Sequence, residues 1–135
     1  MNLISELTVK LADCQFQGHR FNCLPMQGEQ AVLRVEVSQL EEIPIFITMT
    51  ENQILCISYL FTKQEIHSEK EAELNEYLLD LNVPMPLSAF AKVDDHYVIF
   101  GSLTLNSRFE TITHELITLA RNSHDTLQAL EEFIK

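Results

Sequence analysis

Apolar residues recur along this chain with a helical period in three segments. Residues 2–14 place on one helical face Leu3, Ile4, Leu7, Leu11 and Cys14. Residues 68–82 form such a face from Leu74, Tyr77, Leu78 and Leu81. Residues 107–135 keep their apolar positions within a stripe about 100° wide, namely Phe109, Ile112, Leu116, Leu119, Ser123, Leu127, Leu130 and Ile134. We therefore predict helices at the start, in the middle and at the end of the sequence.

The sequence also marks where the second and third helices begin and where the second one stops. Ser68 followed by Glu71 has the spacing of a capping box, in which each side chain satisfies the other residue's free backbone amide. Ser107 and Glu110 repeat this spacing. The letters VPMP follow the middle segment, and their prolines cannot donate the next hydrogen bond of a helix. We expect capped helices from Ser68 and Ser107.

Alternation with period two predicts strands between these helices. It is clearest where Leu33, Val35 and Val37 alternate with Arg34 and Glu36. The predicted strands are 19–26, which Pro25 is expected to shorten, then 31–37, 43–50, 54–61, 87–93 and 97–105. The order α-β-β-β-β-α-β-β-α predicts one α+β domain over residues 1–135, with an antiparallel sheet and helix 107–135 packed on it.

The strand at residues 54–61 is apolar on both sides. One side carries Ile54, Cys56, Ser58 and Leu60, and the other carries Leu55, Ile57, Tyr59 and Phe61. A strand with one solvated face should alternate apolar and polar residues, so we expect both faces of this strand to be covered. Either the middle helix covers the second face within the chain, or Leu55, Ile57, Tyr59 and Phe61 form a surface for a partner or a second copy.

Asp94, Asp95 and His96 stand between the last two predicted strands. Two carboxylates and an imidazole in a row suggest metal ligands or an acid/base pair. Aspartate is also favoured in tight turns, because its side chain bonds nearby backbone amides and tolerates unusual dihedral angles. A solvated hairpin tip offers neither desolvation nor a second shell that orients ligands. We interpret the triplet as a turn and expect no metal there.

The other candidate sites lack the residues that their chemistry needs. His114 and Glu115 begin a zincin-like HExxH motif, but Thr118 occupies the second histidine position. The acidic stripe of the middle helix has no histidine beside it and fits a solvated face; it comprises Glu69, Glu73, Glu76 and Asp80. Nothing local supports a pair of Cys14 or Cys23 with His19, and no glycine-rich phosphate loop occurs. We predict no catalytic, cofactor-binding or metal-binding residues.

Charge and cysteine content narrow the function further. Nine Lys and Arg against 20 Asp and Glu give a net charge of -11 at pH 7. Such a surface repels phosphate backbones and anionic lipids, which disfavours nucleic-acid and membrane-surface binding. No apolar run reaches the ~20 residues of a membrane helix, and the first residues lack the pattern of a secretory signal. The three irregularly spaced cysteines fit a cytoplasmic protein.

Two segments and the final helix resemble the YjfI-like family of bacterial proteins. The segments are PIFITMTENQILCISYLFTKQEI and LNVPMPLSAFAKVDDHYVIFGSLTLNS, and the hallmark is the PMPLSAFAK…YVIFGSL hairpin. The resemblance covers nearly the whole chain and implies a small cytosolic bacterial protein, without any active-site residue. It also suggests, by family resemblance only, a link to a phage-shock-protein-A-like neighbour. More distantly, the element order is similar to type III secretion chaperones and the YbjN family, which are mostly dimeric and bind other polypeptides.

Two functional hypotheses of different class follow. The first is a non-enzymatic cytosolic protein-binding module, chaperone-like or regulatory, that acts as a dimer or binds another protein. The second is a small enzyme or ligand-binding domain whose site is assembled from scattered residues. A pocket of ~300 Å³ or more with convergent polar groups would favour the second. A broad apolar sheet face would favour the first.

Overall fold

The computed structural model describes residues 3–135, so the predicted helix start at residue 2 lies outside the described residues, as does the side chain of Leu3. Three α-helices lie in this range: α1 (Leu3–Ala12), α2 (Glu71–Leu81) and α3 (Phe109–Ala129). The strands are β1 (Gln15–Phe16), β2 (His19–Met26), β3 (Val32–Val37), β4 (Ile45–Met49), β5 (Ile54–Thr62), β6 (Ala89–Val93) and β7 (His96–Leu103). The α+β class and the predicted order are confirmed, with β1 as one additional short strand.

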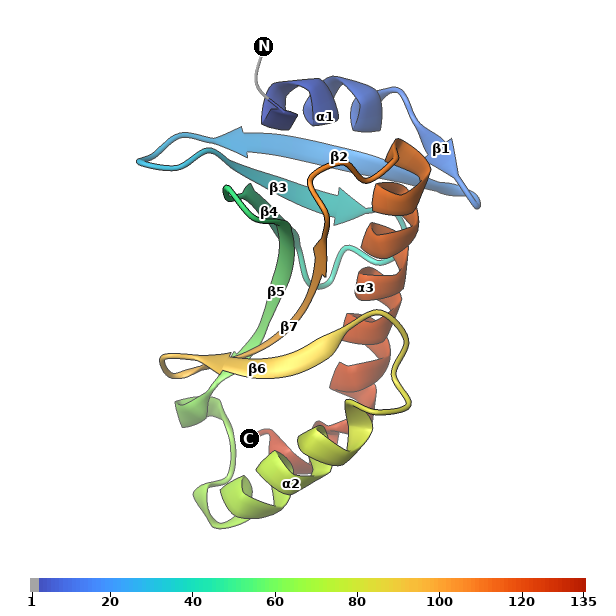
Figure 1. The fold of residues 1–135 in the computed structure, drawn as a ribbon. Helices are drawn as coiled ribbons and strands as arrows, with labels where there is room; N and C mark the ends of the chain where they lie inside the picture. The colour runs from blue at the N-terminus through green and yellow to red at the C-terminus, as the bar shows by residue number, and fades with distance from the viewer. Residues whose placement is uncertain (1–2) are drawn as a thin grey trace.

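The strands form one seven-stranded sheet in the order β1-β2-β3-β4-β5-β7-β6. Every neighbouring pair is antiparallel. The sheet curves strongly, so that the β2–β3 and β6–β7 hairpins project toward the same side (Figure 1). The helices α1, α3 and α2 lie around the opposite, outer side (Figure 1). The sheet therefore has one face lined by helices and one face without them.

Two details near the start of the sheet differ from the prediction. The sequence pattern missed β1, which is joined to β2 by a two-residue turn with Gln17 at φ 53° and Gly18 at φ 81°. Positive φ at both positions is the geometry that suits a tight hairpin. The expected shortening at Pro25 is wrong, because β2 continues to Met26 and pairs Pro25 with Leu33. Proline is tolerated there because β1 pairs only with the other end of β2, which leaves this end at the edge of the sheet.

Both predicted capping boxes are wrong. Residues Ser68–Lys70 form a short 3₁₀ turn, η2, and the α-helix begins only at Glu71. The Glu71 carboxylate instead lies 3.5 Å from Lys63 Nζ. Before α3, the hydroxyl of Ser107 bonds that of Thr104 at 3.1 Å, and the helix starts without a side-chain cap. Glu71 of the first predicted box thus pairs with Lys63, and Ser107 of the second bonds Thr104.

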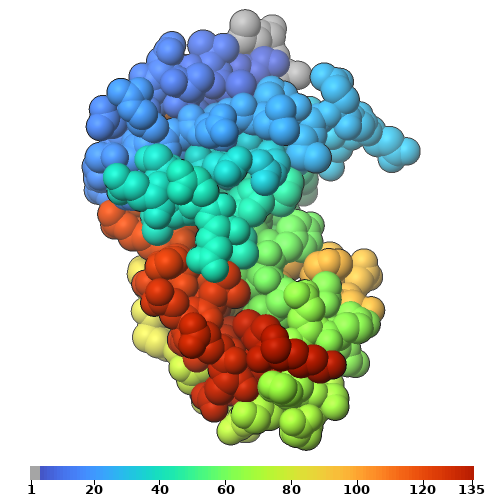
Figure 2. Space-filling view, turned by 180° about the vertical axis from the view of Figure 1, so that it is seen from behind, coloured from blue at the N-terminus to red at the C-terminus, as the bar shows by residue number. Residues whose placement is uncertain are grey.

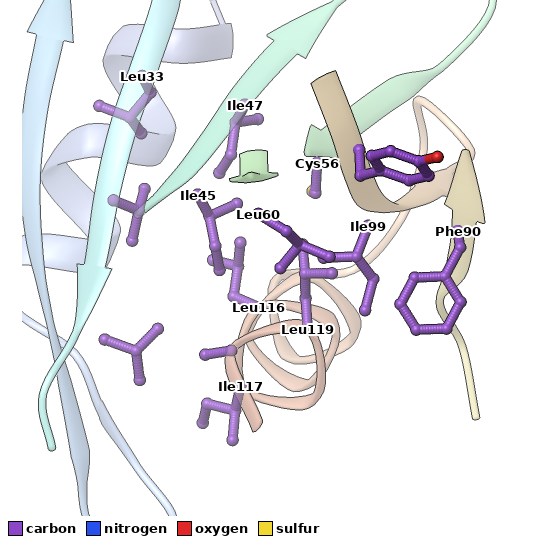
Figure 3. Close-up of a cluster of buried hydrophobic side chains, with 14 of the residues drawn as sticks. Leu33, Ile45, Ile47, Cys56, Leu60, Phe90, Ile99, Leu116, Ile117 and Leu119 are labelled. Atoms are coloured by element: carbon purple, nitrogen blue, oxygen red, sulfur yellow. The ribbon is translucent and has the colours of Figure 1, made fainter. Parts of the chain in front are cut away.

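The main core lies between α3 and the middle of the sheet (Figure 3). Leu116, Ile117 and Leu119 of α3 are buried and face the sheet (Figure 3). The strands meet them with alternate residues that are also buried, namely Leu33, Val35, Ile45, Ile47, Ile54, Cys56 and Ile99. Helix α1 adds Ile4, Leu7 and Leu11 to the same cluster. At 25–30 cal/mol per Å² of apolar surface, burial of each such side chain contributes about 1.5–3 kcal/mol.

Residues 130–135 pack beside α2 and the segment that precedes it. The predicted continuous helix ends at Ala129, and a 3₁₀ turn, η3 (Glu131–Phe133), follows it. The chain then forms an isolated antiparallel bridge between Ile134 and Ile66. Phe133 is buried, and its ring stacks on Tyr77 of α2 with centroids 6.0 Å apart. These contacts end the helix early, because a straight continuation would carry Phe133 away from α2.

Gly101 in β7 marks a close approach between the sheet and α3, as its position within a strand suggests. A Cβ at this position would overlap Glu115 Oε1 and lie 3.2 Å from the carbonyl oxygen of Leu87. The backbone of Gly101 does not have a positive φ. The requirement for glycine is therefore one of space and not of backbone conformation.

We expect Gly101→Ala to lower the free energy of unfolding by about 1–3 kcal/mol, because an added methyl group overpacks this contact. Urea unfolding followed by circular dichroism measures the change. The matched control is Gly28→Ala, whose Cβ would meet no atom closer than the carbonyl oxygen of Gln30 at 3.7 Å. Equal stabilities of the two variants would contradict this account.

Candidate functional site

The face of the sheet opposite the helices carries a continuous group of apolar side chains. We call it the open face, and its central members are Phe46, Leu55, Ile57, Tyr59, Val98 and Phe100, which alternate along β4, β5 and β7 with the residues of the core. Adjacent members pair across the strands, as Phe46 with Ile57 and Ile57 with Phe100. In the space-filling view the molecule is hollowed between the β2–β3 and β6–β7 hairpins, with the green chain around β5 at the base (Figure 2).

The curvature of the sheet shelters the centre of the open face. Val98 is only 1% exposed, whereas Tyr59 on the neighbouring strand is 41% exposed. Phe46, Ile57 and Phe100 have intermediate exposure. On a concave sheet the side chains of adjacent strands lean toward one another and cover the middle residues. The open face is thus a curved apolar floor with Tyr59 standing out of it.

Tyr59 is at the centre of an aromatic row across three strands. Its ring meets the ring of Phe46 edge-on, with centroids 5.9 Å apart, and that of His96 at 5.6 Å. Edge-to-face pairs add about 0.5–1.5 kcal/mol beyond their buried area. On β3 the face continues with Arg34 and Glu36, which pair at 2.8 Å and so neutralise each other. The centre of the open face therefore carries little net charge.

Three of the four predicted surface residues lie on the open face, and the fourth does not. Leu55 and Ile57 are partly exposed and Tyr59 is exposed, as the alternation predicts. The placement of Phe61 on this surface is wrong, because it is 5% exposed and packs in the core against Tyr97, with ring centroids 5.2 Å apart. A β-bulge between Tyr59 and Phe61 inserts Leu60 as an extra residue, which moves Phe61 to the other face.

The middle helix does not cover the open face. Leu74 and Leu78 of α2 are buried in the same cluster as the side chains of α3, and α2 lies beyond β6 on the outer side of the curved sheet (Figure 1). The first alternative left open by the sequence, that the middle helix covers this face within the chain, is therefore wrong. Phe46 was not among the predicted residues, although its position between Ile45 and Ile47 could have placed it on this face.

Asp94 and Asp95 form the tip of the β6–β7 hairpin, as interpreted from the sequence, and His96 is the first residue of β7. Val93 pairs with His96, which leaves a two-residue connection with Asp94 at φ 54°. The backbone N–H of Lys63 donates to the carbonyl oxygen of Asp95 at 2.7 Å. This main-chain bond ties the tip to the end of β5 and does not depend on the carboxylates.

The histidine and cysteines that the sequence analysis considered show no feature of a nucleophile and its base. His19 Nδ1 donates to the carbonyl oxygen of Ser38 at 2.8 Å, and this bond gives it a structural partner other than a cysteine. Burial raises the pKa of the Cys23 thiol to about 11 and that of Cys56 to about 12, the latter with help from the negative charge of Glu115. Thiols with raised pKa values are poor nucleophiles at neutral pH. Within residues 3–135, no group of three or more His, Cys, Asp or Glu side chains could hold a metal ion.

Sequence reasoning considered Glu115 only as part of an incomplete HExxH motif and missed its burial. It lies on the buried side of α3 with 3% exposure, against Gly101 of β7. Desolvation raises the pKa of its carboxyl group to about 7. The available signal was its position three residues after Ile112 and four before Leu119, at the margin of the apolar stripe.

None of the helices in the described range is long and apolar enough to cross a membrane. The fold and the open face define an α+β protein whose curved antiparallel sheet leaves an apolar surface outside its helical layer. The chain belongs to the family described as "Uncharacterized protein conserved in bacteria (DUF2170)", whose model matches residues 2–134. It is 25% identical over 114 residues to "Uncharacterized protein YjfI" of Escherichia coli strain K12, covering 82% of this chain and 84% of that protein. The same protein of Escherichia coli O157:H7 matches equally. The predicted resemblance to the YjfI-like family is thereby confirmed.

We expect the hairpin tip to tolerate replacement of its three polar residues. The triple variant Asp94→Asn, Asp95→Gly and His96→Thr keeps residues suited to a turn and retains the main-chain bond to Lys63. Its unfolding free energy should fall by no more than about 2 kcal/mol, chiefly because His96→Thr removes the edge-on contact with Tyr59, and its metal content should be the same. Stoichiometric zinc or iron that is lost in the variant would contradict the assignment of these residues as a turn.

We expect Glu115 to make folding stability fall as the pH rises from about 4.5 to about 7. In this window the unfolded chain releases the Glu115 proton and the folded chain keeps it, so rising pH favours unfolding. The full loss is about 3 kcal/mol for a shift of this size. Below the window both states are protonated, and above it both are ionised, so the contribution is constant there.

The matched variant is Glu115→Gln, which keeps the shape and removes the titration. Urea unfolding of both proteins at several pH values gives the difference in their stabilities, from which other titrating groups cancel. The variant should gain up to about 3 kcal/mol relative to the unaltered protein between about pH 4.5 and 7. A difference that does not change with pH would show that the Glu115 carboxyl ionises normally in the folded state.

Proposed function

We propose that this chain is a non-enzymatic, cytoplasmic protein-binding module, chaperone-like or regulatory, that dimerises through its open face. The observation that carries the proposal is the apolar floor of β4, β5 and β7, which no helix of the described chain covers. The largest contiguous apolar patch on a monomeric protein is often functional, and larger exposed patches mark interaction surfaces. Free cysteines at positions 14, 23 and 56 fit a reducing compartment.

The distribution of charge allows a second copy to occupy the open face. The chain carries a net charge of -11, and its exposed carboxylates include Glu73, Glu76 and Asp80 on α2. Two such chains repel each other when their acidic surfaces approach. The centre of the open face is apolar, and its Arg34–Glu36 pair is neutral. Contact between two open faces keeps α2 of each copy away from that of the other, since α2 lies on the outer side of the sheet (Figure 1).

The hollows of the molecule fit a binding module better than a small-molecule enzyme. One hollow, lined by Tyr77, Met85 and Phe90, encloses ≈ 260 Å³, and another beside Leu78 encloses ≈ 210 Å³. Both are below the ~300 Å³ at which ligand pockets typically begin. The buried carboxyl of Glu115 does not line either hollow. These features support interaction with polypeptides as the main activity.

We expect Tyr59→Ser to produce a folded protein whose dimer is weaker. Tyr59 is 41% exposed, so its loss leaves the core intact. Each dimer would lose two aromatic side chains at the centre of the contact, and its dissociation constant should rise about tenfold or more. Light scattering coupled to size-exclusion chromatography, over a range of concentrations, measures the change, and circular dichroism confirms the fold.

The matched control is Phe61→Ser, two residues further along the same strand. Because Phe61 is buried against Tyr97, this change should lower the unfolding free energy by about 3–5 kcal/mol. A monomeric unaltered protein at high concentration would rule out dimerisation through the open face. A dimer unaffected by Tyr59→Ser would place the contact elsewhere.

A further inference from the structure

Among residues 3–135, the sheet ends on β6, and no strand of this range lies along its outer edge. In an antiparallel pair, alternate residues exchange both backbone bonds with the partner, and the residues between them direct N–H and C=O away from it. The two-residue turn makes Val93 and His96 a hydrogen-bonded pair, so the same holds for Ala91 with Val98. The backbone groups of Phe90 and Lys92 therefore point to the free edge.

A side chain already occupies part of this edge in the way a strand would. The backbone N–H of Phe90 donates to Oδ1 of Asn82, at the end of α2, at 2.7 Å. This bond confirms the outward direction of the Phe90 amide. The Asn82 amide oxygen stands where the carbonyl oxygen of an eighth strand would stand. Two residues along the strand, the N–H and C=O of Lys92 face the same edge.

A groove runs between this edge and α2. It encloses ≈ 210 Å³ and is lined mainly by apolar groups, among them Leu78, Phe90 and Tyr97. Its polar members include Asn75, whose Oδ1 accepts a hydrogen bond from the Tyr97 hydroxyl at 2.7 Å. The volume suits one or two side chains and is below that of typical small-molecule pockets. Figure 1 shows α2 beyond β6, where a docking strand would pass between them.

The rim of the groove is apolar where a solvated helix should be polar. Leu79 lines the groove and is 68% exposed, and Val83, just past the end of α2, is 89% exposed. The exposed face of α2 turned away from the groove is acidic, namely Glu73, Glu76 and Asp80, and the chain as a whole carries a net charge of -11. A segment lying in the groove meets apolar contacts there and a negatively charged protein around it.

We propose that the groove between α2 and the free edge of β6 binds an extended segment of a partner polypeptide as an additional strand. The segment bonds the outward N–H and C=O of Lys92, places one branched or aromatic side chain in the hollow against Leu78, and covers Leu79. Basic residues flanking that side chain suit the net charge of -11 that the chain carries. Main-chain bonds supply affinity and the side-chain pocket supplies specificity, as in other cases of strand addition.

This site is separate from the open face and does not depend on it. The open face is built from side chains in the middle of the sheet, whereas the groove uses backbone groups at its last strand. A dimer formed through the open face would leave the outer edge of β6 accessible. The two proposals can therefore succeed or fail independently.

The experiment starts from a phage-displayed library of random peptides panned on the full-length protein, in parallel with the variant Leu79→Glu. Leu79 is largely exposed, so this variant should fold normally. Peptides enriched only on the unaltered protein should carry a branched or aromatic residue between basic ones. An absence of peptides that prefer the unaltered protein to the variant would overturn the proposal.

A synthetic copy of the enriched peptide then tests the main-chain bonds. Lys92→Pro removes the outward N–H, which an edge strand tolerates, and Lys92→Ala removes only the side chain. We expect Lys92→Pro to weaken binding about five- to tenfold more than Lys92→Ala. Tyr59→Ser should bind the peptide as the unaltered protein does.

Hydrogen exchange provides a readout that does not depend on a variant. In the isotope-labelled unaltered protein, the peptide should slow exchange of the Lys92 amide. Unchanged exchange of this amide at saturating peptide, or equal binding by both Lys92 variants, would overturn strand addition. The amide measurement decides the question if Lys92→Pro does not fold.

Discussion

The contact between α3 and the centre of the sheet is the interaction on which the rest of the structure depends. Leu116 and Leu119 are completely buried against strands whose inward residues are equally buried. Helix α3 covers one face of the curved sheet, and the buried residues of α1 and α2 belong to the same hydrophobic cluster on that side. The outward residues of β4, β5 and β7 then have no helix to cover them. The apolar open face follows from the side that α3 occupies.

The pattern of apolar residues was sufficient for the class of the fold and the order of its elements, because burial enforces period two and period 3.6 over whole segments. The pattern gave wrong assignments at single residues where a local irregularity, such as a β-bulge, shifts the alternation of inward and outward side chains. Leu60 is the clearest case, since one inserted residue moved Phe61 from the predicted surface into the core. A bulge of this kind leaves no mark in alternation alone. The predicted capping box at Ser107 is wrong for a similar local reason, because the Ser107 hydroxyl bonds the hydroxyl of Thr104.

For the candidate sites, the sequence indicated which side chains share a face of a strand, but not which strand lies at the edge of the sheet. Leu55, Ile57 and Tyr59 could be assigned to one face from the strand they share. The groove beside β6 could not be predicted, because it depends on which strand ends the sheet and on how the loop between α2 and β6 folds. Asn82 shows this well, since its bond to Phe90 joins residues of two elements whose relative position only the fold defines.

The region of Gly101 and Glu115 departs from the rule that buried positions are apolar. Nearby, Leu87 has φ 65°, and the N–H of Ser88 donates to the carbonyl oxygen of Pro86 at 2.8 Å, which closes a three-residue turn. A non-glycine residue in this conformation is strained. Asn122 of α3 holds the turn through bonds of 3.0 Å to Pro86 and Ser88. A buried acid and a strained turn meet at one glycine, and packing of α3 keeps both in place.

The bridge between Ile66 and Ile134 also has a consequence for how the molecule is made. Residues 131–135 supply the stacking partner of Tyr77 and the main-chain partners of Glu65 and His67. These residues are synthesised after every segment that they bind, and chains emerge at ~5–20 residues per second. The stacking and bridge partners of the α2 region are therefore added to the chain only after α2 and every strand of the sheet have been made.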